Sequence, residues 1–166
     1  MPKLSAGLLL YRWLDGEPQV LLVHPGGPFW ARKDDGAWSV PKGEYDPGED
    51  PLEVALREFL EELGVEPPDA GEAVALGELR QPSGKRVTAW ALEGDVDVEN
   101  IESNTFTMEW PPRSGRTGEF PEVDRAGWFG LEEARRKLLR GQVGFLDRFL
   151  QLSNSSPQTK RRMRGK

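Results

Sequence analysis

Hydrophobic and polar positions repeat with a helical period most clearly between residues 51 and 63. When each residue is rotated by about 100°, the apolar residues of this stretch fall on one stripe. These residues are Leu52, Leu56, Phe59 and Leu63. Such a stripe faces the core of a globular protein, and the opposite face is polar. The pattern therefore predicts an amphipathic helix packed against the rest of the fold.

The residues at both ends of this stretch are typical of helix termini. Asp50 stands before Pro51, and Glu53 follows three residues after Asp50. This order supplies an N-cap acceptor, a proline at the first helical position and a second acceptor at N3. Gly64 is typical of a left-handed C-cap, and the prolines at positions 67 and 68 prevent continuation. We expect a helix over residues 51–63.

The other apolar patterns predict a mixture of strands and helices. Leu- and Val-rich stretches with period-two or continuous apolar patterns are typical of strands. We expect strands over residues 4–13, 19–24, 37–40, 73–80, 86–93 and 105–110, and helices over residues 131–140 and 143–152. Asp15-Gly16 predicts a hairpin turn between the first two strands. Residues 111–123 are too irregular for a regular element, and a long loop is often functional.

Composition narrows the chemistry. The 166 residues are enough for one domain with a sizeable core, and they include no cysteine and one histidine, His24. Within one chain this excludes Cys-His catalysis and histidine-rich zinc sites. We expect His24 to be a strand-end residue with no special role, and contact with a ligand stays open. No apolar run approaches the ~20 residues of a membrane span, so we expect a cytoplasmic protein.

Charge divides the chain at residue 153. The formal net charge is −6, but five bases and no acid follow position 152, so residues 1–152 carry −11. An acidic body argues against broad nucleic-acid binding. The composition of residues 153–166 predicts a disordered basic tail after a single domain of residues 1–152.

Three glutamates lie close together on the polar face of the predicted helix. Glu58, Glu61 and Glu62 fall within about 100° of one another, a spacing at which like charges destabilise a helix. A solvated acidic face is the plainer interpretation of any one of them. The complete set favours a bound divalent cation, and oxygen ligands suit Mg²⁺. A pairing of Arg57 with Glu49 would fix the preceding loop to the helix.

The stretch of residues 43–65 resembles a Nudix box, G-x5-E-x7-R-E-U-x-E-E-x-G-U, in which U is a bulky apolar residue. The nine defined positions are matched by Gly43, Glu49, Arg57, Glu58, Phe59, Glu61, Glu62, Gly64 and Val65. The resemblance implies an α/β fold, a Nudix α/β/α sandwich around a mixed sheet. It also implies Mg²⁺-dependent hydrolysis of a phosphoanhydride in a nucleoside diphosphate linked to another moiety, with Mn²⁺ as a substitute cofactor.

The resemblance also suggests roles for individual residues. Glu58 and Glu62 are the surest metal ligands, and Glu61 is a ligand or the general base. Glu122 is the second candidate for the base, or an extra ligand. The carbonyl of Lys42 is a candidate metal ligand, and its side chain a candidate phosphate contact.

Two segments carry candidate substrate-binding side chains. The loop of residues 25–36 presents Phe29, Trp30 and Lys33, which would suit stacking on a base with a phosphate contact. Folding of both aromatic rings beneath the loop is an equally good interpretation. Arg113 and Arg116 could bind phosphates from the segment of residues 111–123.

The segment of residues 128–134, Trp-Phe-Gly-Leu-Glu-Glu-Ala, resembles the diadenosine-polyphosphate hydrolase branch of the same family. That branch places an acid upstream, as Glu122 lies here, but flanks it with histidines where this chain has Pro121 and Val123.

Three alternative functions stay open. They are cleansing of damaged nucleoside triphosphates, a non-catalytic nucleotide-binding regulator, and action on RNA ends through the basic tail.

Overall fold

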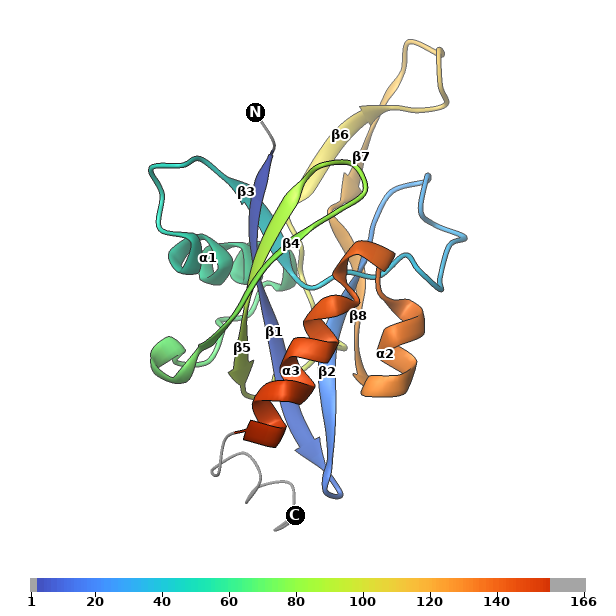
Figure 1. The fold of residues 1–166 in the computed structure, drawn as a ribbon. Coiled ribbons are helices and arrows are strands. Elements are labelled where there is room, and N and C mark those ends of the chain that lie inside the picture. The colour runs from blue at the N-terminus through green and yellow to red at the C-terminus, as the bar shows by residue number, and fades with distance from the viewer. Residues whose placement is uncertain (1–2, 156–166) are drawn as a thin grey trace.

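A six-stranded mixed sheet forms the centre of the protein in the computed structural model, which describes residues 3–155 (Figure 1). The strand order is β4-β5-β1-β2-β8, and β3 pairs with β1 outside this order. The strands are β1 (Leu4–Leu14), β2 (Glu17–Pro25), β3 (Lys42–Tyr45), β4 (Val74–Arg80), β5 (Arg86–Glu93) and β8 (Val123–Gly130). The basic cluster of residues 160–166 lies outside the described residues.

Strand β1 organises the sheet because it has three partners. It runs parallel to β5 from Leu4 to Tyr11, and antiparallel to β3 at one end and to β2 at the other. Where β1 and β2 diverge, the segment of residues 39–41 fills the gap. The Leu8 amide donates to the Pro41 carbonyl at 3.1 Å, and the Val23 amide donates to the Ser39 carbonyl at 2.8 Å. These two hydrogen bonds fix the position at which β3 begins, and therefore the position of the Lys42 backbone.

Helices cover both faces of the sheet. Because successive residues of a strand point to opposite faces, Leu8 and Leu9 of β1 enter different cores. Leu8 packs in the cluster that contains Phe59 of α1 (Pro51–Leu63). Leu9 packs in the cluster that contains Ala134 of α2 (Leu131–Lys137) and Phe145 of α3 (Gly144–Ser155). The expected α/β/α sandwich is confirmed.

The predicted helix of residues 51–63 is confirmed at both ends. The Asp50 carboxylate accepts a hydrogen bond from the Leu52 amide at 3.3 Å. Gly64 adopts a φ of 72°, and its amide donates to the Leu60 carbonyl at 2.7 Å. The buried face is rotated slightly from the predicted stripe. It consists of Val54, Ala55, Phe59 and Leu63.

Several predicted boundaries differ from the structure. Residues 37–40 form only isolated bridges at Trp38 and Ser39, because they lie where β1 and β2 diverge. The helix predicted to reach residue 140 ends at Lys137, because Leu138 is extended with a ψ of 146°. Short 3₁₀ turns occupy Ala70–Glu72 and Arg140–Gln142. The final helix continues to Ser155, three residues past the expected domain boundary, and Ser153 is buried.

The expectation of an irregular segment at residues 111–123 is wrong for its second half. Residues 117–121 form β7 (Thr117–Pro121), which pairs with β6 (Thr105–Glu109) in a separate hairpin. Phe106 and Phe120 face each other across this hairpin with ring centres 6.0 Å apart. Figure 1 shows the hairpin projecting beyond the sheet. No helix within residues 3–155 is both long and apolar enough to cross a membrane.

Candidate functional site

The acidic face of α1 lies beside β3, and backbone groups of β3 hold two of its glutamates. The Lys42 amide donates a hydrogen bond to Oε1 of Glu62 at 3.2 Å. The Glu58 side chain lies against Gly43, so closely that a β-carbon added to Gly43 would overlap its carboxylate. The glycine of the box is therefore required for the placement of Glu58, and the strand fixes the neighbouring carboxylates.

Crowding raises the proton affinity of these glutamates. Burial, followed by a hydrogen bond to Glu61 and the charge of Glu61, raises the pKa of Glu58 to about 7. Burial raises the pKa of Glu62 to about 8, with a further contribution from the charges of Glu58 and Glu122, although Lys42 opposes the change. Both carboxyl groups therefore have raised pKa values because they are removed from water, and neighbouring carboxylates add to the effect.

Backbone hydrogen bonds bring Glu122 to the same place. The Asn104 amide donates to the Glu61 carbonyl at 2.9 Å, the Glu122 amide to the Asn104 carbonyl at 2.8 Å, and the Gly26 amide to the Glu122 carbonyl at 3.0 Å. This chain of three bonds ties the end of α1 to the junction between β7 and β8. Burial, and then the charge of Glu61, raise the pKa of Glu122. The structure thus joins a fourth carboxylate to the three on the helix.

Lys42 has a neighbour, Lys85, that no pattern in the sequence predicts. Burial, followed by the charge of Lys85, lowers the pKa of Lys42 to about 8, while Glu62 and Glu44 oppose the change. Lys85 Nζ also lies 3.6 Å from Oε2 of Glu44. Lys85 follows the turn between β4 and β5, so only the pairing of β5 and β3 with β1 brings it close to Lys42. No local motif could have identified it.

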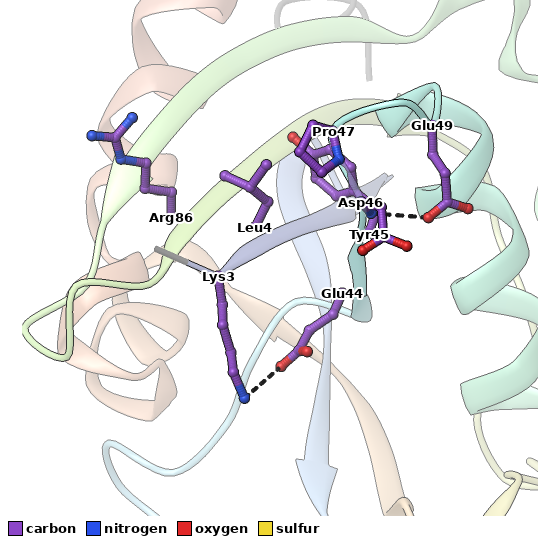
Figure 2. Close-up of a pocket in the computed structure, with 8 residues that line it drawn as sticks. All are labelled: Lys3, Leu4, Glu44, Tyr45, Asp46, Pro47, Glu49 and Arg86. Carbon is purple, nitrogen blue, oxygen red and sulfur yellow. Dashed lines mark hydrogen bonds and ion pairs between the residues drawn. The ribbon is translucent and has the colours of Figure 1, made fainter. Parts of the chain in front are cut away.

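Glu49 and Arg57 are paired, but weakly. Glu49 Oε2 lies 3.5 Å from Nη1 of Arg57, with both side chains substantially exposed. Oε1 of Glu49 accepts a shorter bond, 2.9 Å, from the Asp46 amide. That backbone bond is the main cause of the lowered pKa of Glu49, ahead of Arg57. Glu49, Asp46 and Lys3 line a cavity whose volume is about 690 Å³. Figure 2 shows these side chains. Glu49 therefore stabilises the loop before α1.

A small cleft adjoins the glutamates. Its volume is about 200 Å³, and Lys42, Glu62 and Glu122 line its polar side. Trp30 and Val123 contribute to its apolar wall. This is less than the ~300–1,000 Å³ of a complete ligand pocket. The cleft can therefore hold one part of a ligand, such as a base, while the remainder lies over the glutamates.

The two aromatic residues of the loop have different environments, which separates the two interpretations left open above. Trp30 packs against the core and borders the cleft, whereas Phe29 is 61% exposed. Their rings lie 5.3 Å apart, edge to face. Lys33 Nζ lies 4.1 Å from the ring centre of Phe29 and 5.1 Å from that of Trp30. Trp30 is thus the one placed to contact a ligand in the cleft, and Lys33 stacks on both rings.

Arg113 and Arg116 lie on the loop at the tip of the β6–β7 hairpin, which extends away from α1 (Figure 1). The amides of Arg113 and Gly115 donate to the Glu109 carboxylate at 3.1 and 3.0 Å, which fixes the shape of this loop. The structure does not bring these two arginines beside the glutamates of α1.

The donor set fits a hard divalent cation. Side chains of Glu58, Glu61 and Glu62 offer only oxygen atoms, the ligands that such an ion prefers, and the raised pKa values of Glu58 and Glu62 arise from burial and then from neighbouring carboxylates. Among residues 3–155, no three acidic, histidine or cysteine side chains already converge on one point. Mg²⁺ keeps several waters and often takes only one or two carboxylates, so the chemistry of the site suits it.

Proteins similar in sequence to this chain include two kinds of hydrolase. A mouse bis(5'-nucleosyl)-tetraphosphatase [asymmetrical] is 62% identical over 101 residues, which cover 58% of each protein. The Caenorhabditis elegans protein of the same name is 39% identical over 61 residues, 37% of this chain and 40% of that one. An RNA pyrophosphohydrolase of Rhizobium meliloti is 31% identical over 109 residues, 58% and 60% of the two chains. The chain thus spans about two fifths to three fifths of these relatives.

Solved structures share the fold over nearly the whole chain. A C. elegans Ap4A hydrolase binary complex superposes with a TM-score of 0.62 at 24% identity, covering 92% of this chain and 99% of that one. The NUDIX domain of Shewanella oneidensis NrtR complexed with ADP ribose also gives 0.62, at 18% identity and coverage of 91% and 88%. The sequence model of the NUDIX domain matches residues 1–149. With the intact box and this arrangement of sheet and helices, the chain belongs to the NUDIX domain family.

Proposed function

We propose that this protein hydrolyses a phosphoanhydride bond in a nucleoside diphosphate linked to another moiety, with Mg²⁺ as cofactor and dinucleoside polyphosphates as the favoured substrates. The observation that carries the proposal is the cleft, where Lys42, Glu62 and Glu122 face an apolar wall that includes Trp30. One side suits phosphates with their cations, and the other suits a base.

The apolar wall supports a nucleoside substrate. Base–aromatic stacking is worth about 1–3 kcal/mol per base and does not depend strongly on the identity of the base. Trp30 can supply one such surface. Lys42 and Lys85 would meet the phosphates as paired cations, because their mutual repulsion, which contributes to the lowered pKa of Lys42, is relieved by an anion between them.

The glutamates divide the remaining tasks. Glu58 and Glu62 would hold the metal ion, since β3 fixes both side chains. When bound, the ion would neutralise phosphate charge and lower the pKa of a coordinated water. Glu61 or Glu122 would orient the attacking water and accept its proton, and a raised pKa, as at Glu122, favours that role near neutral pH.

The names of the relatives favour dinucleotides as the first candidate and RNA ends as the second. Proteins similar to this chain include both asymmetrical bis(5'-nucleosyl)-tetraphosphatases and RNA pyrophosphohydrolases. Both classes of reaction cleave phosphoanhydride bonds. The basic cluster of residues 160–166 is a reason to keep RNA as a candidate, since cationic segments bind phosphate backbones.

A panel of substrates with Mg²⁺ tests the proposal. We expect ATP and AMP from diadenosine tetraphosphate, and slower turnover of nucleoside triphosphates, ADP-ribose and 5'-triphosphorylated RNA. Monophosphate and pyrophosphate from triphosphates as the best reaction would instead indicate cleansing of nucleotides. Loss of RNA turnover alone on truncation after Ser155, where α3 ends, would indicate RNA. Binding of nucleotides without turnover of any substrate would refute an enzyme and indicate a regulator.

A further inference from the structure

His24 is the only histidine in the sequence, and it is completely buried near the end of β2. Both of its ring nitrogens have partners. Nε2 lies 2.6 Å from the carbonyl oxygen of Lys33, in the aromatic loop, and Nδ1 lies 2.8 Å from Oδ1 of Asp124, on β8. The ring therefore bridges two segments of the chain that do not pair with each other here.

Both partners of the ring are acceptors. A carbonyl oxygen accepts only, and so does an ionised carboxylate, whose charge Arg125 supports from 3.7 Å. A neutral imidazole has one N–H and can donate to only one of them. Both bonds exist together only when both nitrogens carry protons, and distances of 2.6 and 2.8 Å are typical of charge-assisted bonds.

We propose that His24 is a positioning residue that holds the aromatic loop against β8 and thereby fixes Trp30 at the cleft. The Lys33 amide donates to the Trp30 carbonyl at 2.9 Å, so the residue that His24 holds is bonded directly to Trp30. The start of the loop is held by the Gly26 amide on the Glu122 carbonyl, and its last three residues by the Gly36 amide on the Arg136 carbonyl and by ion pairs of Asp34 and Asp35 with Lys137. His24 bonds the backbone at Lys33, between these two groups of contacts. The consequence for substrate binding rests on the proposed function.

Charged and aromatic side chains from neighbouring segments surround the ring. Asp124 faces Nδ1, and Arg125 stands opposite His24 in the register of β2 and β8. Trp38 covers the ring at 5.2 Å, and beyond it Asp34 pairs with Lys137 at 2.7 Å while accepting from the indole of Trp38. Loss of one ring proton removes one of the two bonds and loosens the loop.

Two substitutions separate positioning from general packing. His24→Gln keeps a buried polar side chain but cannot donate to both acceptors. Asp124→Asn offers an N–H to a neutral ring, so both bonds survive without the second ring proton. For His24→Gln we expect KM for diadenosine tetraphosphate to rise about tenfold, the equivalent of about 1.4 kcal/mol, with kcat within about twofold. Asp124→Asn should keep KM close to the wild-type value.

Two measurements do not need turnover. Trypsin cleavage after Arg32 and Lys33, both exposed, should be faster in His24→Gln at equal thermal stability. Because the chain has one histidine, the imidazole NMR signals report its protonation without assignment. In the wild type at the pH of the assay, they should show protons on both ring nitrogens, as the two bonds to acceptors require. Unchanged cleavage and KM in His24→Gln, or a neutral ring while KM stays low, would overturn the proposal. If the protein does not hydrolyse diadenosine tetraphosphate, the proposed function fails, and the trypsin cleavage and NMR results still test the positioning role of His24.

Discussion

Replacement of Glu62 by glutamine is expected to stabilise the metal-free protein at alkaline pH and to abolish its stabilisation by Mg²⁺. Glu62 accepts a hydrogen bond from the Lys42 amide at 3.2 Å. A glutamine oxygen can accept the same bond. The substitution therefore removes a charge from the site while it preserves the local geometry.

The magnitude follows from the pKa of Glu62, which burial raises from 4.5 to about 8. Each pKa unit corresponds to about 1.4 kcal/mol. Because the titration of Glu62 is coupled to that of Lys42 and the other glutamates, we expect Glu62 to change the free energy of unfolding by on the order of 2–4 kcal/mol. A raised pKa in the folded state gives stability that is complete below pH 4.5 and is lost as pH rises through about 8. Glu62→Gln has no ionisable group at this position, so its stability does not fall with pH for this reason.

The assay is urea unfolding of both proteins in EDTA at pH 5 and pH 9, with thermal melts across a Mg²⁺ titration at each pH. The free energy of unfolding of the wild type should fall relative to the variant between the two pH values. Comparison at the same pH cancels the titration of groups that do not interact with Glu62, whereas the substitution also removes the charge that opposes the lowered pKa of Lys42. Mg²⁺ should raise the melting temperature of the wild type only. A variant less stable than the wild type at pH 9 in EDTA, or equally stabilised by Mg²⁺, would refute the reasoning.

Three further predictions test other parts of the site. Gly43→Ala should displace the Glu58 carboxylate and lower kcat by at least about tenfold, measured by turnover, with a crystal structure as control for the fold. Gln142→Leu should cost about 1–3 kcal/mol in urea unfolding, because the buried Gln142 accepts from the Val40 amide at 3.0 Å; an unchanged stability would contradict this. Between Glu61→Gln and Glu122→Gln, the variant that loses the lower pH limb of kcat identifies the base.

The sequence could predict the elements whose signals are local. Helix α1 has its cap at Asp50, its left-handed glycine at Gly64 and its apolar stripe within 15 residues, and the structure places its ends where expected. Strand β8 has no such signal. Its sequence contains Asp124 and Arg125 beside glycines, and it becomes a strand through pairing with β2, about 100 residues away. Strand β7 likewise depends on pairing with β6.

The same distinction separates the residues of the site. Glu58, Glu61 and Glu62 could be found because the period of one helix places them on one face. Glu122 was found through a resemblance, and the structure adds the three backbone bonds that carry it to α1. Lys85 had no signal, since two strand pairings, of β5 and of β3 with β1, are needed to bring it beside Lys42.

The aromatic loop shows why composition could not assign its side chains. Phe29 and Trp30 are adjacent and chemically alike, yet one is 61% exposed and the other borders the cleft. The difference depends on where the loop is held, and the central contact is made by His24, which lies outside the loop in sequence. His24, whose two ring nitrogens are bonded to Asp124 and to the Lys33 carbonyl, can therefore decide which aromatic ring contacts a ligand. The specificity of this site is therefore expected to depend on the anchors of the loop as much as on the residues that the loop presents.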